Sequence, residues 1–207
     1  MFFRKVIDKL QTLLSRLFNR CYELHMRKRL KNQDFTILCS NCIVGTIYHR
    51  LGLQFRSPTV NLWMHQRDFL QLAANPDLVY GELHFIHSDC DYPVAELNGI
   101  TIYFNHSKTE EEARCSWERR AKRINRDNIF LILYDREDIT EEDICAFGQI
   151  PCRGRLVLSN REYPHILYVK TMKPSNRLFG QQFIDRDWLG FRTFEKHFDY
   201  VSWLNQE

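Results

Sequence analysis

The stretch Asp34-Phe-Thr-Ile-Leu-Cys-Ser-Asn-Cys-Ile-Val-Gly-Thr-Ile-Tyr-His-Arg-Leu51 decides the fold class of this chain. Its first residues, up to Cys39, form a short apolar run that is typical of a buried strand. Ser40 and Asn41 are residue types that commonly cap helices, so the apolar segment after them predicts a helix over 42–51. A buried strand that runs directly into a helix indicates an α/β domain.

The rest of the chain continues this alternation of strands and helices. Asn98-Gly99 predicts a hairpin between residues 93–97 and 100–104, and Ser107-Lys-Thr-Glu110 predicts a capping box that opens a charged helix to about residue 125. Further strands are predicted at 58–62, 128–134, 155–158 and 166–170, and further helices at 65–75, 140–147 and 194–204. We therefore expect a single α/β domain over residues 32–207, with a mixed β-sheet and helices on both faces.

The N-terminal segment differs from the rest of the chain in its charge. Residues 1–31 hold nine basic and two acidic side chains, a charge of +7, whereas the whole chain of 207 residues carries only +3. Apolar residues recur in this segment at helical spacing, which predicts an amphipathic basic helix over 2–30. Such a helix suits an anionic membrane surface or a membrane enzyme as partner. The alternative is a helix that packs on the body and leaves its charges solvated.

Composition excludes several classes of protein. With 44% hydrophobic and 27% charged residues, the chain is globular and not disordered. It contains neither G-x-G-x-x-G nor a P-loop motif, so we expect no nucleotide cofactor. Residues 32–207 are acidic overall, which predicts no nucleic-acid partner. No stretch approaches the roughly 20 apolar residues of a membrane span. The odd number of cysteines, seven, and the lack of a signal-peptide pattern predict a reducing, cytoplasmic compartment.

Cys42 is the strongest candidate for chemistry, because it lies where the predicted strand passes into the predicted helix. Backbone N–H groups and the helix dipole at such a position stabilise a thiolate. His106, at another strand-to-helix junction, is the best-placed general base, whereas His49 lies two turns further along the helix of Cys42. The alternative is that Cys42 packs as a small hydrophobic side chain under the sheet.

Two other patterns are compatible with a redox site or a metal site. Cys39-Ser-Asn-Cys42 is a C-x-x-C motif, but Cys39 belongs to the predicted strand, which is the wrong position for an attacking thiol. His84, His87 and Cys90 could offer ligands to zinc, but positions three apart on a strand point to opposite faces. We therefore expect no metal site.

The charged helix after residue 107 holds a surplus of arginine. Arg119, Arg120 and Arg123 could clamp a phosphate or pyrophosphate bidentately. The alternative is a solvated helix face with ion pairs four residues apart, such as Glu110 with Arg114.

Several ordered blocks of the sequence resemble a known family. They are residues 40–52 with Arg56-Ser-Pro-Thr-Val-Asn-Leu62, residues 92–99 with Phe104-Asn-His106, residues 107–125, and residues 194–205. Over roughly residues 34–205 the chain is similar to a domain-of-unknown-function family of bacterial exopolysaccharide and capsule loci. Members of that family are often labelled exopolysaccharide biosynthesis proteins or acyltransferases, so the resemblance implies a place in cell-surface polysaccharide assembly.

The principal hypothesis is a transferase that moves an acyl or other group onto a sugar, with a nucleotide-linked or lipid-linked saccharide as substrate. Cys42 would be the nucleophile, and His106 would be the base that takes its proton. Ser40, Asn41 and the helix amides would hold the oxyanion. The three arginines 119, 120 and 123 would hold the phosphate of the donor or acceptor.

Two other hypotheses stay open. A non-catalytic accessory protein would use residues 1–31 to sit beside a membrane glycosyltransferase complex, at the inner face of the cell membrane. A glycosyltransferase would need a D-x-D metal site, for which Asp89-Cys-Asp91 is the match in this chain.

Overall fold

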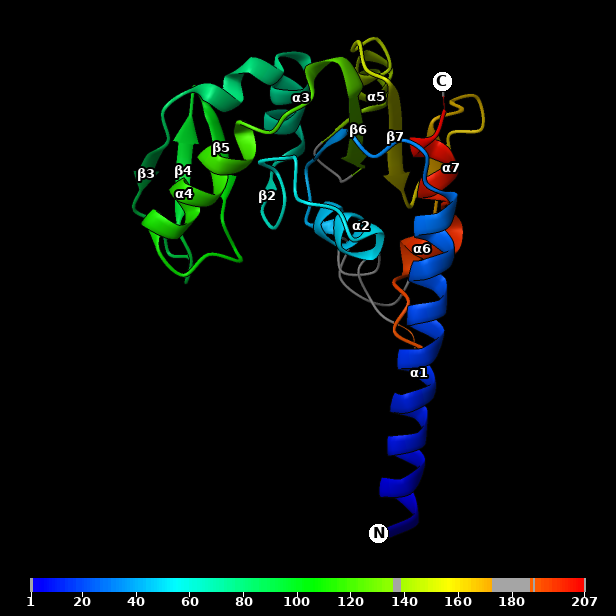
Figure 1. The fold of residues 1–207 in the computed structure, drawn as a ribbon. Coiled ribbons are helices and arrows are strands. Elements are labelled where there is room, and N and C mark those ends of the chain that lie inside the picture. The colour runs from blue at the N-terminus through cyan, green and yellow to red at the C-terminus, as the bar shows by residue number, and fades with distance from the viewer. Residues whose placement is uncertain (1, 136–138, 173–186, 188, 207) are drawn as a thin grey trace.

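The strands form two separate sheets (Figure 1). The structure, a computed structural model, describes residues 2–135, 139–172, 187 and 189–206. A parallel sheet has the order β1 (Thr36–Cys39), β6 (Ile129–Tyr134), β7 (Gly154–Ser159) and β8 (Val169–Thr171). An antiparallel sheet has the order β2 (Trp63–Met64), β5 (Ile100–Tyr103), β4 (Val94–Leu97) and β3 (His84–Ile86). The expected α/β class is confirmed, with parallel and antiparallel pairings divided between the two sheets.

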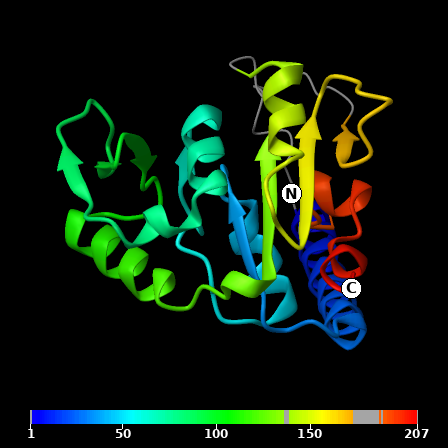
Figure 2. The same cartoon turned by 90° about the horizontal axis from the view of Figure 1, so that it is seen from above.

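Except at its edge strand β8, the parallel sheet is buried on both faces, as its nearly continuous apolar strands require. Leu38 and Leu131 point into one core cluster, whereas Ile37 and Phe130 point into the other. The first cluster is completed by α3 (Gln66–Ala74), α4 (Glu110–Ala121), α5 (Glu141–Phe147) and the antiparallel sheet. The second is completed by the end of α1 (Phe2–Arg29) and by α2 (Ile43–Leu51), α6 (Thr193–His197) and α7 (Tyr200–Leu204) (Figure 2).

The antiparallel sheet is anchored at the carboxyl end of β1. The backbone N–H of Met64 in β2 donates a hydrogen bond of 3.2 Å to the carbonyl of Ser40, directly after β1. Ile100 and Ile102 of β5 are fully buried in the core cluster on the inner side of this sheet. Asn98 and Gly99 have positive φ angles of 49° and 81°, as the predicted hairpin turn requires. Consequently β2 and β5 lie next to the point where β1 passes into α2.

The strand predicted over 58–62 is wrong. Asn61 has a φ of 61°, a left-handed conformation that interrupts an extended strand, so β2 begins only at Trp63. The adjoining helix α3 agrees with the prediction over 65–75. The chain also forms two short 3₁₀ turns: η1 (Pro76–Tyr80) follows α3, and η2 (Arg126–Asn128) precedes β6.

Two predicted helices also differ at their ends. The charged helix is capped by Thr109 and not by Ser107: the Thr109 hydroxyl accepts the N–H of Glu112 at 3.1 Å, and the helix ends at Ala121. The last helix is divided into α6 and α7, because Asp199 caps the second piece by accepting the N–H of Ser202 at 3.2 Å.

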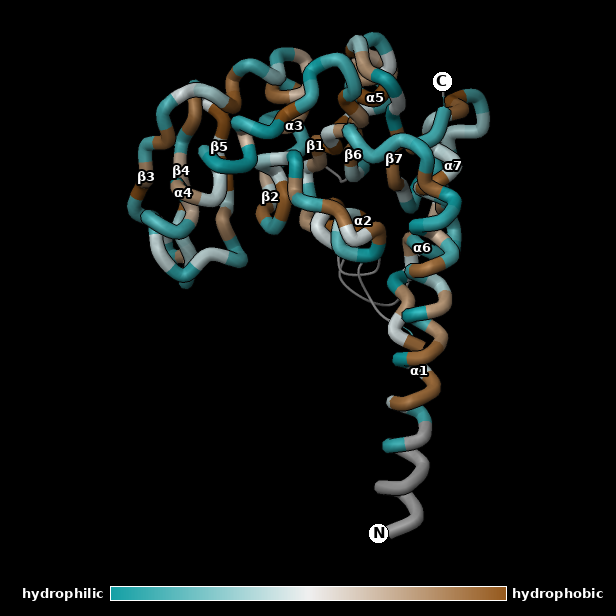
Figure 3. The backbone as a smooth tube through the Cα atoms, viewed as in Figure 1, coloured by the Kyte–Doolittle hydropathy of each residue, from teal (hydrophilic) through white to brown (hydrophobic). Residues whose placement is uncertain are grey.

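From Ser15 on, α1 contacts the body with one face and leaves the opposite face in solvent, whereas its N-terminal half projects beyond the body (Figures 1 and 3). Asn19 and Glu23 reach Arg50 on α2, and Met26 is buried in the core. At 3.6 residues per turn, a second set of side chains lies on the far side of the helix. This set is apolar and exposed, and comprises Leu13, Leu14, Leu17, Phe18 and Leu24. The helix is therefore packed on the body without burying its apolar face.

Arg50 is the buried cation that fixes α1 and the C-terminal segment against α2. Its guanidinium makes a bidentate pair with Glu195 at 2.9 and 3.2 Å and a second ion pair with Glu23 at 3.1 Å. It also donates to the carbonyl of Gly190 at 3.2 Å and to the side chain of Asn19. Burial alone would lower the pKa of Arg50, but the hydrogen bonds and charges of the two glutamates more than offset this and raise it.

We predict that Arg50→Ala destabilises the protein by about 3 kcal/mol or more, because it leaves the Glu195 carboxylate buried without its cation. Thermal and urea unfolding measure the loss, and hydrogen exchange along α1 should rise in the same variant. Arg126→Ala is the matched control: it removes an exposed ion pair with Asp77 and should change stability by less than about 1 kcal/mol. Equal losses in the two variants would contradict the assigned role of Arg50.

Candidate functional site

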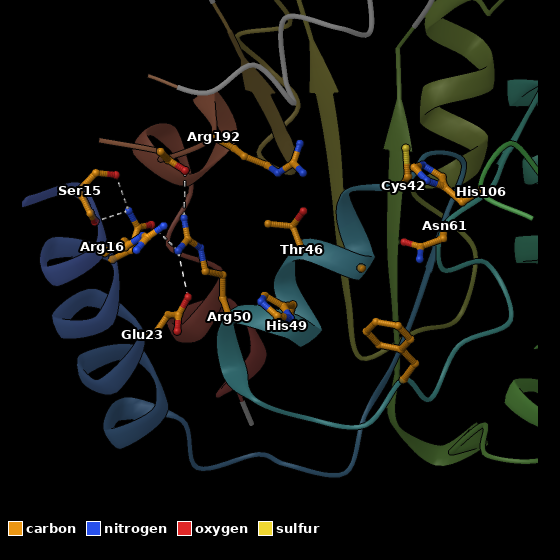
Figure 4. Close-up of a pocket in the computed structure, with 14 residues that line it drawn as sticks. Ser15, Arg16, Glu23, Cys42, Thr46, His49, Arg50, Asn61, His106 and Arg192 are labelled. Atoms are coloured by element: carbon orange, nitrogen blue, oxygen red, sulfur yellow. Dashed lines mark hydrogen bonds and ion pairs between the residues drawn. The ribbon is translucent and has the colours of Figure 1, made fainter. Parts of the chain in front are cut away.

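A pocket of about 600 Å³ runs along the exposed side of α2 (Figure 4). Cys42, Gly45, Thr46, His49 and Arg50 follow one another along its floor, at the spacing of one helix face. One wall comes from α1 and from residues 190 and 192, and the other comes from residues 55, 61 and 106. The pocket therefore lies where α1, α2 and the loops next to β2 and β5 meet.

Cys42 lies at the position expected from the sequence, immediately before the first residue of α2. Its side chain is half-buried, lines the pocket, and donates a hydrogen bond from Sγ to Oδ1 of Asn41 at 3.3 Å. Cys39, by contrast, is fully buried in β1 and does not line the pocket. Burial raises the pKa of its thiol far above the ordinary value. The C-x-x-C motif therefore contains one accessible thiol and one inert thiol.

His106 lines the same pocket as Cys42. It lies on the short connection between β5 and α4, where the N–H of Ser107 donates to the carbonyl of Phe104 at 2.9 Å and tightens the turn. Figure 4 draws His106 and Cys42 at the same end of the pocket, near the carboxyl end of the parallel sheet. The two residues expected to act together thus share one cavity, and their chemical roles stay a prediction.

Asn61 is the pocket residue at this end that sequence reasoning missed. Its Oδ1 lies where a side chain on Gly45 would be, because a Cβ built on Gly45 would stand only 2.5 Å from that oxygen. The absence of a side chain at Gly45 therefore lets the amide of Asn61 approach the first turns of α2. Asparagine tolerates a positive φ better than most residues, which is the one signal in the sequence that could have marked this position.

Ser40 and Asn41 are close to the pocket but have other partners. Ser40 is buried, and its hydroxyl accepts the N–H of Tyr134 at 3.3 Å, which ties β1 to β6. Asn41 is 6% exposed, and its N–H donates to the sulfur of Cys39 at 3.4 Å. Neither is among the residues that line the pocket, so the amide that faces it there is that of Asn61.

The three arginines of α4 and its end are placed outside the lining of the pocket. Arg120 donates to the carbonyl of Val60 at 2.7 Å and Arg123 to that of Phe55 at 3.3 Å, whereas Arg119 is exposed. Burial, followed by the charges of Arg119 and Arg123, lowers the pKa of Arg120. Arg120 and Arg123 therefore hold the segment that carries Phe55 and Asn61 to the pocket, and direct phosphate binding by the three stays a prediction.

The guanidinium groups that do line the pocket are those of Arg16, Arg50 and Arg192. Arg50 is neutralised by Glu23 and Glu195, and Arg16 and Arg192 are the two further cationic side chains in the lining of this end. Figure 4 shows Arg16 on α1 and Arg192 near α6, across the pocket from Cys42. A thiol at one end and guanidinium groups at the other suit a substrate with a reactive carbonyl and an anionic group.

The candidate metal motifs gain no support from the geometry. Within residues 2–135, 139–172, 187 and 189–206, no three His, Cys, Asp or Glu side chains come together as a metal site would require. In the same part of the chain, no helix is long and apolar enough to cross a membrane.

The fold and the pocket define an α/β protein with an accessible thiol at the start of a helix. Comparison with known proteins adds that residues 13–205 match the model of the family DUF1919, a domain of unknown function. The chain is also 34% identical, over 184 residues, to an uncharacterised protein of Haemophilus influenzae, covering 87% of this chain and 88% of that protein. The chain therefore belongs to the DUF1919 family. The match includes the part of α1 that packs on the body.

We predict that Gly45→Ala destabilises the protein by about 1–3 kcal/mol, because the new methyl group meets the Asn61 side chain in a packed position. Asn61→Gly should be nearly neutral alone, since glycine accepts the positive φ at that position. In the double variant the cost of Gly45→Ala should largely disappear. Thermal unfolding of the four proteins measures this coupling, and strictly additive effects would show that the two residues do not meet.

Proposed function

We propose that this protein is a cysteine-dependent group transferase of bacterial cell-surface polysaccharide biosynthesis, which moves an acyl group onto a sugar. The observation that carries the proposal is the presence of Cys42, at the start of α2, and His106 in one pocket of about 600 Å³. The amides of the first turn of α2 favour the thiolate form of such a cysteine. The assignment to polysaccharide assembly rests on the sequence resemblance described above.

In the first step, His106 takes the proton of the Cys42 thiol, and the sulfur attacks the carbonyl carbon of an activated acyl donor, a thioester or an ester. The bond from that carbon to the leaving group breaks, and the leaving group takes the proton from His106. The acyl group then stays on Cys42 as a thioester. Asn61, which lines the same end of the pocket, and the first amides of α2 would hold the oxyanion of this step.

In the second step, His106 removes the proton of a sugar hydroxyl, and the hydroxyl oxygen attacks the thioester carbonyl. The carbon–sulfur bond breaks, an ester forms on the sugar, and the Cys42 thiolate recovers its proton from His106. Arg16 and Arg192 bind the phosphate of the nucleotide or lipid carrier at the other end of the pocket. The cluster of Arg119, Arg120 and Arg123 adds a positive field behind the wall formed by Phe55.

We predict that Cys42 is alkylated by iodoacetamide at pH 7 at least tenfold faster than the exposed thiols Cys21, Cys115 and Cys145. Peptide mass spectrometry over time measures all the thiols in one sample. Exposure alone gives the opposite order, because Cys42 is less accessible than these three. A Cys42 that reacts more slowly than all three would therefore contradict the proposed activation.

We predict that Cys42→Ser abolishes polysaccharide production in a bacterial strain that lacks the chromosomal gene, while its melting temperature changes little. Cys145→Ser, at an exposed thiol outside the pocket, is the matched control and should restore production fully. Full restoration by Cys42→Ser would favour the non-catalytic accessory protein instead.

We further propose that α1 holds the protein on an anionic membrane surface at the inner face of the cell membrane. Five of the eight large apolar side chains exposed in the described structure lie on the outward face of α1, so the exposed apolar surface is concentrated there. Arg16, Arg20 and Lys28 lie on the exposed part of the same helix. Basic side chains beside an exposed apolar helix face are typical of helices that lie in a membrane interface. The side chains of residues 1–8 and 10 lie outside the described part.

We predict that the full chain floats with vesicles of phosphatidylglycerol and phosphatidylcholine, but not with phosphatidylcholine alone. Each basic residue near an anionic surface contributes about 1 kcal/mol, so flotation should fall as salt rises. The triple variant Leu13→Ser, Leu17→Ser, Phe18→Ser should lose flotation and keep its fold, because these side chains are more than half exposed. Leu167→Ser, at a position 92% exposed on the body, is the control. Concentration-dependent dimerisation that the same triple variant abolishes, without flotation, would assign the face to a second copy instead.

A further inference from the structure

A row of apolar and aromatic side chains crosses the outer face of the antiparallel sheet. The register pairs Trp63 of β2 with Tyr103 of β5, Tyr103 with Val94 of β4, and Val94 with Ile86 of β3. The rings of Trp63 and Tyr103 stack with centroids 3.8 Å apart and planes 7° apart. Both rings are half-buried and Ile86 is 43% exposed, whereas Val94 between them is only 2% exposed, so the solvent-facing part of the row is the aromatic pair and Ile86. Ile102, on the inner face, is fully buried. The row therefore presents a rigid aromatic surface to solvent.

Polar groups border this aromatic pair on both sides. Thr101, Glu96 and His84 form the next cross-strand row, and Glu96 and His84 are exposed. At the edge of the rings, Nε1 of Trp63 donates to the hydroxyl of Tyr92 at 3.4 Å, and Nε2 of His65 lies 3.4 Å from the hydroxyl of Tyr103. Donors and acceptors are thus fixed around the aromatic surface.

The chemistry of this face fits an uncharged, polyhydroxylated ligand. The side chains just named include no lysine or arginine. Lys108 lines the adjoining pocket of Ile86, Tyr92 and Val94, but Asp91 and Glu110 line it too, so a ligand rich in phosphate would find little net counter-charge here. A pyranose ring has one face of C–H groups, whose positive polarisation matches the negative face of an aromatic ring. Its hydroxyl groups would bind the carboxylate of Glu96 and the imidazole and phenol groups at the rim. We propose that the outer face of the antiparallel sheet, centred on Trp63 and Tyr103, binds neutral pyranose units of a saccharide.

This surface adjoins the reactive end of the pocket along the chain. Asn61 precedes Trp63 by two residues and His106 follows Tyr103 by three, so these pairs lie within roughly 7 and 11 Å of each other at full extension. A saccharide that lies on the rings can therefore extend towards Cys42. In this respect the inference deepens the proposed function, because it supplies the binding site of the acceptor sugar. Binding itself does not depend on acyl transfer.

Binding of neutral hexasaccharides to the full-length protein tests the proposal. Isothermal titration calorimetry with glucose-, galactose- and N-acetylglucosamine-based hexamers should show binding to at least one of them. Trp63→Ala and Tyr103→Ala should each weaken that binding at least tenfold. Cys42→Ser should bind as the wild type does, so that a failure of the transferase proposal and a failure of this one give different results.

Tyr80→Ala is the matched control, since Tyr80 is 50% exposed and belongs to η1, outside this sheet. It should leave binding unchanged. Should Trp63→Ala not fold by circular dichroism, Trp63→Phe replaces it and should weaken binding at least threefold, because a smaller ring remains. The proposal is overturned if no hexamer binds to the wild type, or if hexamers bind equally well to the Trp63 and Tyr103 variants.

Discussion

The shape of the molecule and of its pocket depends on the hydrogen bonds and ion pairs of the buried Arg50 guanidinium. It lies at the end of α2 and binds groups from two separate parts of the chain, α1 and residues 190–195, among them Glu195, 145 residues away. A buried arginine needs acceptors for its donors, and here those acceptors come from α1, from Gly190 before α6 and from Glu195 within α6. The same contacts that satisfy Arg50 bring Arg16 and Arg192 to one end of the pocket. Because Arg50 itself is neutralised, it positions the positive end of the pocket and adds little charge of its own.

The opposite end of the pocket depends on a different constraint, the passage of β1 into α2. The strand ends in buried Cys39 and is followed by buried Ser40, and both are hydrogen-bonded to their neighbours, so the next turn presents Cys42 to the cavity. The antiparallel sheet begins beside this junction, through the bond from Met64 to Ser40, and brings Asn61 and His106 to the same place. Along the chain, Asn61 is two residues from Trp63 and His106 is three residues from Tyr103, the stacked pair on the outer face of that sheet. The thiol, the amide and the imidazole thus line one pocket, and short stretches of chain join that pocket to the aromatic pair.

Local patterns in the sequence predicted the parts of this arrangement that depend on local structure. The run of residues 34–51 gave the first strand and helix with Cys42 between them, and Asn98-Gly99 gave the hairpin. Contacts between distant residues could not be predicted in this way. Three features depend on segments that come together only in the folded chain. They are the left-handed conformation of Asn61, the hydrogen bonds from Arg120 and Arg123 to backbone carbonyls, and the bonds of Arg50. The division of the strands into two sheets follows from the same long-range packing, since each strand alone is compatible with either sheet.

We propose that Cys42 carries the transferred group. The most direct measurement is to mix the protein with p-nitrophenyl acetate or with acetyl-coenzyme A, stop the reaction in acid, and locate the acetyl group by peptide mass spectrometry. The acetyl group should appear on Cys42 in the wild type, should form at least tenfold more slowly in His106→Ala, and should be absent from that peptide in Cys42→Ser. An acetyl group found only on other residues, or equally fast labelling of Cys42 in the His106 variant, would contradict the claim.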